Sequence, residues 1–119
     1  MPGDTYWLYG DNPIMNLFEL PDISTDKEFS ENLVPDKGVC IERIISFGQA
    51  SPEGFWYDQD RDEWVALIQG EAVLRWKNGE VKNMKPGDWV FIPAHEKHRV
   101  DKTTSDPPCL WLAVHGKIS

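Results

Sequence analysis

The most constraining feature of this 119-residue sequence is a series of short apolar segments that glycine and proline interrupt at short intervals. Apolar and polar residues alternate from Val39 to Phe47, which is the period of a strand with one face in a core. Further strands are expected at residues 64–69, 72–76, 80–84, 89–92, 98–101 and 110–115. Repeated short strands separated by such turns predict an all-β sandwich or a closed barrel.

Two of the expected turns have a defined chemistry. Asn78-Gly79 readily adopts the positive φ angles of a tight hairpin. Pro86-Gly87 suits the two central positions of a type II turn. The strands on either side of Asn78-Gly79 are therefore expected to run antiparallel.

The first third of the chain lacks a sustained period. We expect residues 1–37 to form an N-terminal arm with one or two short strands, and residues 38–119 to form the barrel. A turn of helix is expected around Asp26 to Asn32, because Ser24 or Thr25 can cap it.

The charge balance limits the partners. Twelve Lys and Arg residues against twenty Asp and Glu residues give a net charge of −8, which repels phosphate backbones and anionic lipid headgroups. Nucleic acid and membrane are therefore not expected partners, and a small-molecule ligand is.

The expected compartment is the cytoplasm. The first nine residues lack the pattern of a signal peptide, and no apolar run approaches the roughly 20 residues that cross a bilayer. The two cysteines, Cys40 and Cys109, form no CxxC pair and are expected to be free thiols.

Two spaced groups of residues are candidates for chemistry. Six residues separate Glu63 from Gly70, five separate Gly87 from Pro93, and His98 follows. This pattern resembles the two motifs of the cupin family, and more narrowly a group of small single-domain cupins with no assigned reaction. The resemblance covers about two thirds of the chain. It implies a double-stranded β-helix, or jelly-roll, barrel with a small-molecule pocket inside.

The first motif is degenerate. The family has a pair of histidines before the glutamate, and here those positions hold Trp56 and Asp58, or Tyr57 and Gln59. In the second motif, His95 replaces the family's glycine. The resemblance therefore supports the fold more strongly than the activity.

The resemblance implies a divalent metal, with Mn, Fe, Ni or Zn as the candidates. Glu63 and His98 match two ligands by position, and Asp58, Gln59 or His95 would complete the set. With so few imidazoles, such a site should bind transition ions weakly and favour harder ions such as Mn or Mg. The family's chemistry would then be that of an oxygenase, isomerase or decarboxylase.

Two alternatives need no metal. The chain could be a binding or sensing module for a small polar ligand, or an acid–base isomerase or epimerase that uses His98 as its base. In either case the expected pocket residues are Trp56, Tyr57, Arg99 and Trp111. His98 could also be an ordinary hydrogen-bonded core histidine.

The two other histidines have simpler explanations. His95 lies in an expected turn, so exposure is favoured over metal ligation, and His115 at the end of the last strand is expected to be structural or exposed.

The expected assembly is a homodimer. Small cupins of this kind commonly pair by extending their sheets, which hides strand edges, and the N-terminal arm could supply an exchanged strand.

Overall fold

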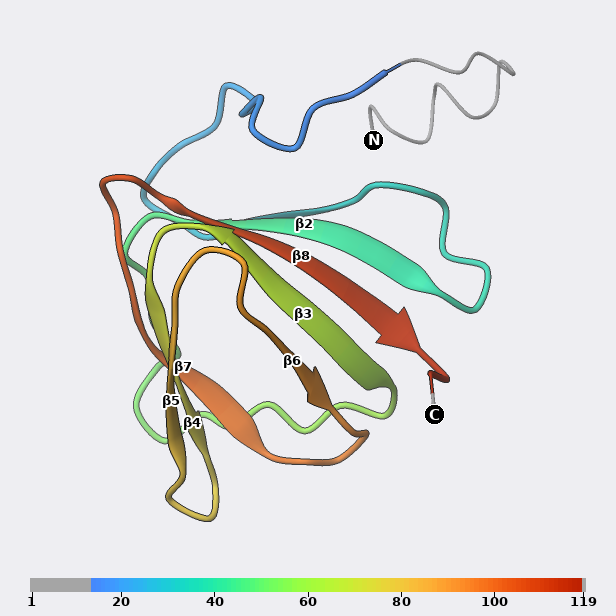
Figure 1. Cartoon of the computed structure of the whole chain (residues 1–119), viewed down its shortest axis with the longest axis vertical. Helices are drawn as coiled ribbons and strands as arrows, with labels where there is room; N and C mark the ends of the chain where they lie inside the picture. Colours follow the sequence, from blue (N-terminus) through green and yellow to red (C-terminus); the bar gives the residue numbers. More distant parts are fainter. Residues whose placement is uncertain (1–13, 119) are drawn as a thin grey trace.

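Antiparallel strands account for the regular structure of the chain (Figure 1). The computed structural model describes residues 14–118, and no helix occurs among them. The strands are β1 (Phe29–Asn32), β2 (Cys40–Ser46), β3 (Asp62–Gln69), β4 (Ala72–Trp76), β5 (Val81–Met84), β6 (Trp89–Ile92), β7 (His98–Thr103) and β8 (Cys109–Gly116). The all-β prediction is confirmed.

The strands form two sheets. One sheet has the order β1-β2-β8-β3-β6, and the other has the order β5-β4-β7. Neighbours such as β2 and β8 are distant in sequence, so the chain crosses repeatedly between the sheets, as in a jelly roll. The inner faces of the two sheets enclose the core.

The predicted turn of helix at residues 26–32 is wrong. Ser24 Oγ accepts the N–H of Asp26 at 3.2 Å, so the expected helix cap closes a local turn instead. Phe29–Asn32 then pairs with Glu42–Ile45 of β2 as strand β1. A paired strand satisfies the backbone groups of this segment, whereas an isolated turn of helix is marginal.

A buried arginine ties the segment before β1 to the sheet. Arg43 of β2 donates to the carbonyl oxygens of Leu17 (2.9 Å) and Glu19 (2.8 Å), and its Nη2 lies 2.8 Å from Glu31 Oε2. The arm is therefore held to the outer face of β2 by charge-assisted hydrogen bonds. Residues 1–13 of the expected arm lie outside the described residues, and exchange of the arm between subunits stays a prediction.

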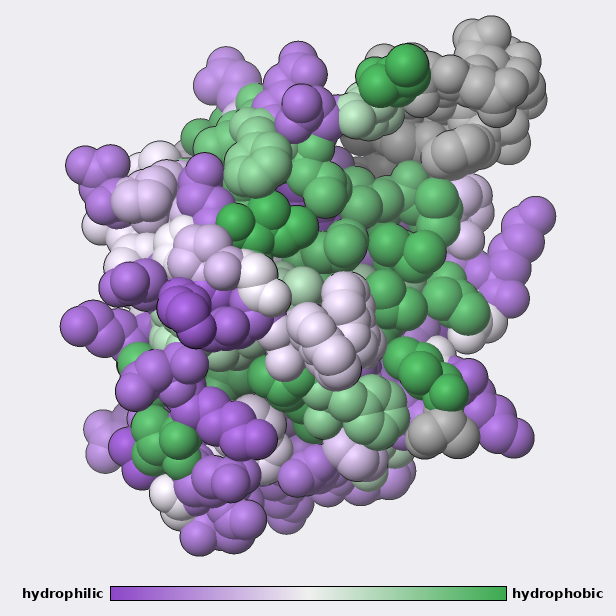
Figure 2. All heavy atoms as spheres, in the orientation of Figure 1, coloured by the Kyte–Doolittle hydropathy of each residue, from purple (hydrophilic) through white to green (hydrophobic). Residues whose placement is uncertain are grey.

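The outer face of the five-stranded sheet is unusually apolar. One row of paired residues across β2, β8, β3 and β6 consists of Ile41, Val114, Trp64 and Phe91. The next row consists of Arg43, Leu112, Ala66 and Trp89. Apolar side chains gather over β2, β8 and β3 in Figure 2. The outer face of an antiparallel sheet is usually polar, so this face has the composition of a covered surface.

Steric crowding explains why position 70, which matches the glycine of the first cupin motif, holds a glycine. It has φ +85°, and a Cβ there would lie 2.8 Å from both Cys109 Sγ and Thr104 Oγ1. Gly54 has a similar φ of +80° but has nothing within 4 Å of such a Cβ. A substitution at either glycine would therefore strain the backbone, but only a substitution at Gly70 would also cause a clash.

We expect Gly70→Ala to lower the free energy of unfolding by roughly 2 to 4 kcal/mol, because it adds a clash to the strain of a positive φ. Gly54→Ala should cost only about 1 kcal/mol, from strain alone. Urea unfolding of both variants measures the difference. Equal losses would mean that the space around Gly70 does not constrain the fold.

Candidate functional site

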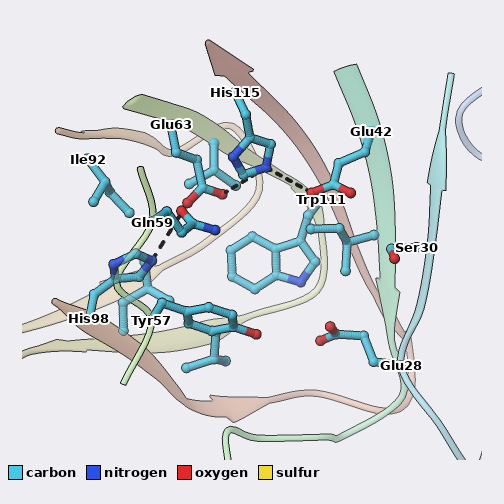
Figure 3. Close-up of a pocket in the computed structure, with 14 residues that line it drawn as sticks. Glu28, Ser30, Glu42, Tyr57, Gln59, Glu63, Ile92, His98, Trp111 and His115 are labelled. Carbon is cyan, nitrogen blue, oxygen red and sulfur yellow. Dashed lines mark hydrogen bonds and ion pairs between the residues drawn. The ribbon is translucent and has the colours of Figure 1, made fainter. Parts of the chain in front are cut away.

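A cavity of about 240 Å³ opens between the two sheets (Figure 3). Its wall combines carboxylates, two imidazoles, aromatic rings and aliphatic side chains. The lining residues are Glu28, Ser30, Glu42, Ile44, Tyr57, Gln59, Glu63, Val65, Leu74, Ile92, His98, Val100, Trp111 and His115.

The carboxylate of Glu63 lies between two histidines at one end of the cavity. His98 Nε2 is 3.6 Å from Glu63 Oε1, and His115 Nε2 is 3.8 Å from Glu63 Oε2. The side chains of Glu63 and His98 are only 9% and 7% exposed. Both separations exceed a hydrogen-bond length, so charge attraction rather than direct hydrogen bonding links the three groups.

The pairing of strands brings these groups together. Glu63 of β3 lies directly opposite His115 of β8 and opposite Ile92 of β6. His98 begins β7 in the other sheet, and an isolated bridge pairs it with Tyr57. Side chains of opposite residues share a face of a sheet, so Glu63 and His115 both point inward.

A backbone carbonyl fixes the orientation of His98. Its Nδ1 lies 2.9 Å from the carbonyl oxygen of Glu96, which can only accept, so Nδ1 carries a hydrogen. The ring stacks on Tyr57 with a centroid distance of 5.4 Å. Nε2 is therefore the atom that faces Glu63 and the cavity (Figure 3).

A second carboxylate holds His115. His115 Nε2 lies 2.8 Å from Glu42 Oε1, which is a hydrogen-bond distance. Glu42 comes from β2 and Glu63 from β3, on either side of β8. His115 thus lies between two carboxylates, and its Nε2 proton is engaged by Glu42.

These neighbours change the protonation of both histidines. Burial disfavours the charged ring of His98, but Glu63 and the Glu96 carbonyl outweigh it, so the pKa of His98 lies above its usual value. The hydrogen bond to Glu42 raises the pKa of His115 against the opposing effect of burial, and Glu63 adds to the rise. Both rings are stabilised in the charged form.

A hydrogen-bonded chain lies at the other end of the cavity. Trp111 Nε1 donates to Ser46 Oγ at 3.2 Å, and Ser46 Oγ donates to Glu28 Oε2 at 3.1 Å. Partial burial raises the pKa of Glu28, the nearby charge of Glu42 adds to the rise, and the Ser46 hydrogen bond opposes it. Ser46 thereby fixes the indole of Trp111 relative to a carboxylate.

Two of the predicted metal ligands do not join this cavity. Asp58 and His95 pair with each other at 2.8 Å, and their side chains are 44% and 68% exposed. His95 has φ +65°, a left-handed conformation that glycine adopts most easily, which explains why the family has glycine there. Of the predicted ligands, the cavity brings together Glu63, His98 and Gln59.

The four predicted pocket residues divide in the same way. Tyr57 and Trp111 line the cavity, whereas Trp56 and Arg99 do not. The guanidinium of Arg99 lies 5.8 Å from the ring of Trp56 and donates to the Ser51 carbonyl at 2.9 Å. Arg99 thus holds the loop before β3, which includes Trp56, from outside the cavity.

Three candidate functional residues were not predicted from the sequence: Glu28, Glu42 and His115. His115, which was expected to be structural or exposed, is only 8% exposed and lines the cavity, so the exposed alternative is wrong. The alternation in β8 carried the signal, since His115 shares its face with the buried Trp111 and Ala113. Glu42 likewise shares its face of β2 with Ile44, and both line the cavity.

Comparison with known proteins decides the family. The model of the cupin domain matches residues 48–115, which is more than half of the chain. The chain belongs to the cupin family. The predicted membership of the cupin family is therefore confirmed, and with it the cupin-type barrel.

Solved structures agree with this cupin assignment. The cupin is 44% identical to a candidate mannose-6-phosphate isomerase from Ralstonia eutropha JMP134, with a TM-score of 0.83 over 90% of this chain and 100% of that one. It is 18% identical to a cupin superfamily protein from Desulfitobacterium hafniense DCB-2, with a TM-score of 0.68 over 82% and 84% of the two chains. The second likeness shows the fold alone.

One curated protein matches over a shorter stretch. The cupin is 34% identical over 47 residues to RclR, an RCS-specific HTH-type transcriptional activator of Escherichia coli strain K12. The match covers 40% of this chain and 16% of that protein.

The metal that cupins commonly bind does not fit the donors of this chain. The part of the chain that the structure describes holds no cluster of three or more His, Cys, Asp or Glu side chains arranged as a metal site. His115 Nε2 is committed to Glu42, and Asp58 and His95 are paired outside the cavity. Glu63, His98 and the neutral amide of Gln59 remain, which is a poor set for Mn, Fe, Ni or Zn.

We expect Glu63→Gln to lower the pKa of both His98 and His115, because the substitution removes the negative charge between them. Proton NMR titration of the ring signals measures both values. Asp58→Asn, which removes an exposed carboxylate outside the cavity, should leave them unchanged. Unaltered histidine pKa values in Glu63→Gln would contradict the placement of this carboxylate.

The same shifts set a pH dependence of stability. A raised folded-state pKa contributes stability that is fully present below the usual histidine pKa of about 6.5 and is lost as the pH rises through the folded value. The free energy of unfolding should therefore fall as the pH increases above about 6.5. The fall should be smaller in Glu63→Gln, and an equal fall in both proteins would contradict the pairing.

Proposed function

We propose that this cupin binds a small polar ligand in its barrel and catalyses metal-independent proton transfer on it. The observation that carries the proposal is the Glu63 carboxylate, which is nine-tenths buried and lies 3.6 and 3.8 Å from two imidazoles. These gaps leave both the carboxylate and His98 Nε2 available to a ligand that enters from the cavity. Hydrogen bonds at catalytic groups are often long until a substrate binds.

The proposed reaction is proton transfer at a carbon next to a carbonyl group, as in an isomerase or epimerase. Glu63 takes the proton as the C–H bond breaks, and the imidazolium of His98 donates its Nε2 proton to the carbonyl oxygen, giving an enol. The reverse transfers, with the proton returned to a different carbon or face, complete an isomerisation. His115 and Glu42 position Glu63 and do not contact the reacting atoms.

Charge argues against a sugar phosphate as the ligand. Mannose 6-phosphate, which the name of the Ralstonia protein specifies, carries a phosphate dianion. No Lys or Arg lines the cavity among the described residues, whereas three glutamates do. Phosphate recognition usually needs such cations or a helix N-terminus. We therefore propose an uncharged or cationic ligand for this chain.

A second candidate function is metal-free sensing. The stretch shared with RclR, a transcriptional activator, supports it, and the chain covers only 16% of that protein's length. A sensing module would bind the same class of ligand without converting it, so the absence of turnover on a bound ligand distinguishes the two functions.

We also propose that the cupin is a homodimer, paired through the outer face of the five-stranded sheet rather than through its edges. The row of Ile41, Val114, Trp64 and Phe91 carries no charge, and in the next row Arg43 is neutralised by Glu31. A chain with a net charge of −8 repels its own copies except where such an uncharged face meets itself. A two-fold axis pairs one patch with its twin and requires no complementary partner.

The cytoplasm stays the proposed compartment. Cys40 and Cys109 are both buried and free, which is typical of proteins in a reducing environment. Among the described residues there is no helix with the length and apolar character to cross a membrane.

Deuterium incorporation from heavy water into a panel of small ketones and aldehydes, followed by NMR, tests the proton transfer. We expect Glu63→Gln to slow exchange of an accepted compound by about 100-fold or more and His98→Gln to slow it comparably. Asp58→Asn is the matched control and should keep the wild-type rate. Exchange that survives in Glu63→Gln would overturn the proposal.

Light scattering coupled to size-exclusion chromatography tests the dimer. Val114→Glu places a charge in the centre of the apolar row, twice in each dimer, so it should weaken association by about 100-fold or more. Val81→Glu makes the same change at an exposed site of β5 and should remain dimeric. A monomeric wild type, or a dimeric Val114→Glu, would exclude this face.

A further inference from the structure

The cavity has two chemically different ends. Glu63, His98 and His115 form one end, and the carboxylate of Glu28 is turned inward at the other (Figure 3). Trp111 and Tyr57 lie between them. A ligand that extends from Glu63 to Glu28 therefore contacts aromatic rings and two carboxylates.

The charge of the lining is negative at every protonation state of its histidines. The three glutamates contribute −3, and the two histidines contribute +2 when both are protonated, which leaves −1, or −3 when both are neutral. The same negative charges act on the hydroxyl of Tyr57. Burial raises its pKa, and the charges of Glu28, Glu63 and Glu42 raise it further. Tyr57 is thus surrounded by carboxylates that no described Lys or Arg in the lining offsets.

Glu28 differs from Glu42 and Glu63 in having no histidine partner. Its hydrogen-bond partner among the described residues is the Ser46 hydroxyl, at 3.1 Å, and no nearby cation lowers its pKa. The residue lies at the exposed edge of the sheet, while its carboxylate faces the cavity. A partly desolvated carboxylate beside an aromatic ring is a receptor for a positive group.

The geometry points to a small organic cation, a protonated amine or a quaternary ammonium compound, as the ligand class of this pocket. Its positive group lies against Glu28 and the rings of Trp111 and Tyr57, and the rest of the molecule extends toward Glu63 and His98. Aromatic faces attract such cations, and the carboxylate adds a direct counter-charge. This inference rests on the proposed function and names the substrate class of the same site.

Calorimetric titration with matched probes tests the charge of the ligand. Choline is the cationic probe, dimethylbutanol is its uncharged carbon isostere, and inorganic phosphate is the anion. We expect saturable binding of choline, at least about tenfold weaker binding of dimethylbutanol, and no heat from phosphate. Equal binding of choline and dimethylbutanol, or binding of phosphate to the wild type, would overturn the inference.

Substitution locates the cation within the pocket. Glu28→Gln should weaken choline binding by about tenfold or more, because it removes the counter-charge and keeps the shape of the side chain. Glu53→Gln makes the same change of charge on an exposed loop outside the cavity and should bind choline like the wild type. Equal affinities of the two variants would overturn the placement at Glu28.

The ligand class and the proton transfer can fail separately. If choline and dimethylbutanol bind equally while Glu63→Gln still abolishes deuterium exchange, the ligand class is wrong and the proposed function stands. If choline binds selectively through Glu28 while Glu63→Gln leaves exchange unchanged, the proton transfer is wrong and the pocket is a receptor for cations.

Discussion

A carboxylate buried between two sheets is the constraint on which the site depends. Taking an ion such as Glu63 out of water costs several kcal/mol unless opposite charge compensates it. His98 and His115 supply that charge from opposite sheets, and Glu42 in turn engages His115. The four groups therefore stabilise one another, and removing any one would leave the buried charges unbalanced.

The two faces of the five-stranded sheet differ in composition. Its inner face alternates core residues such as Val65 with the polar groups of the cavity. Its outer face is apolar and nearly free of charge, which is the reverse of a sheet that faces water. The placement of Arg43 is informative, because this cation on the outer face is neutralised by Glu31 and bound by carbonyls of the arm. We therefore propose that the outer face serves assembly and the inner face serves chemistry.

Periodicity and turn chemistry predicted most of the fold. Residues 72–76 and 89–92 are strands with the expected bounds, because both are short apolar runs flanked by glycine or proline. The helical turn predicted at residues 26–32 is wrong because the pairing of β1 with β2 is a long-range contact that no local signal reports. Gly70 and Glu63 were identified through the resemblance to the cupin motifs, and the structure supplies the steric reason for the first.

The candidate site was harder to predict than the fold. The resemblance to the cupin motifs identified Glu63 and His98, but it also suggested Asp58 and His95, which pair on the outside of the barrel. Glu42 and His115 reach the cavity through the pairing of β2 and β3 with β8, and that strand order cannot be inferred from any single segment of the sequence. Residues that form one site from four strands can be recognised only after the strands are placed.

Metal content of protein purified without a metal-affinity tag tests most directly whether histidines, rather than an ion, compensate Glu63. Plasma mass spectrometry of the wild type and of a Glu63→Ala, His98→Ala double variant, each incubated with Mn, Fe, Ni and Zn and then dialysed, gives the measurement. Negligible metal in both proteins is the expected result. Near-stoichiometric metal in the wild type that is lost in the double variant would show that Glu63 and His98 hold an ion, and would contradict a metal-independent site.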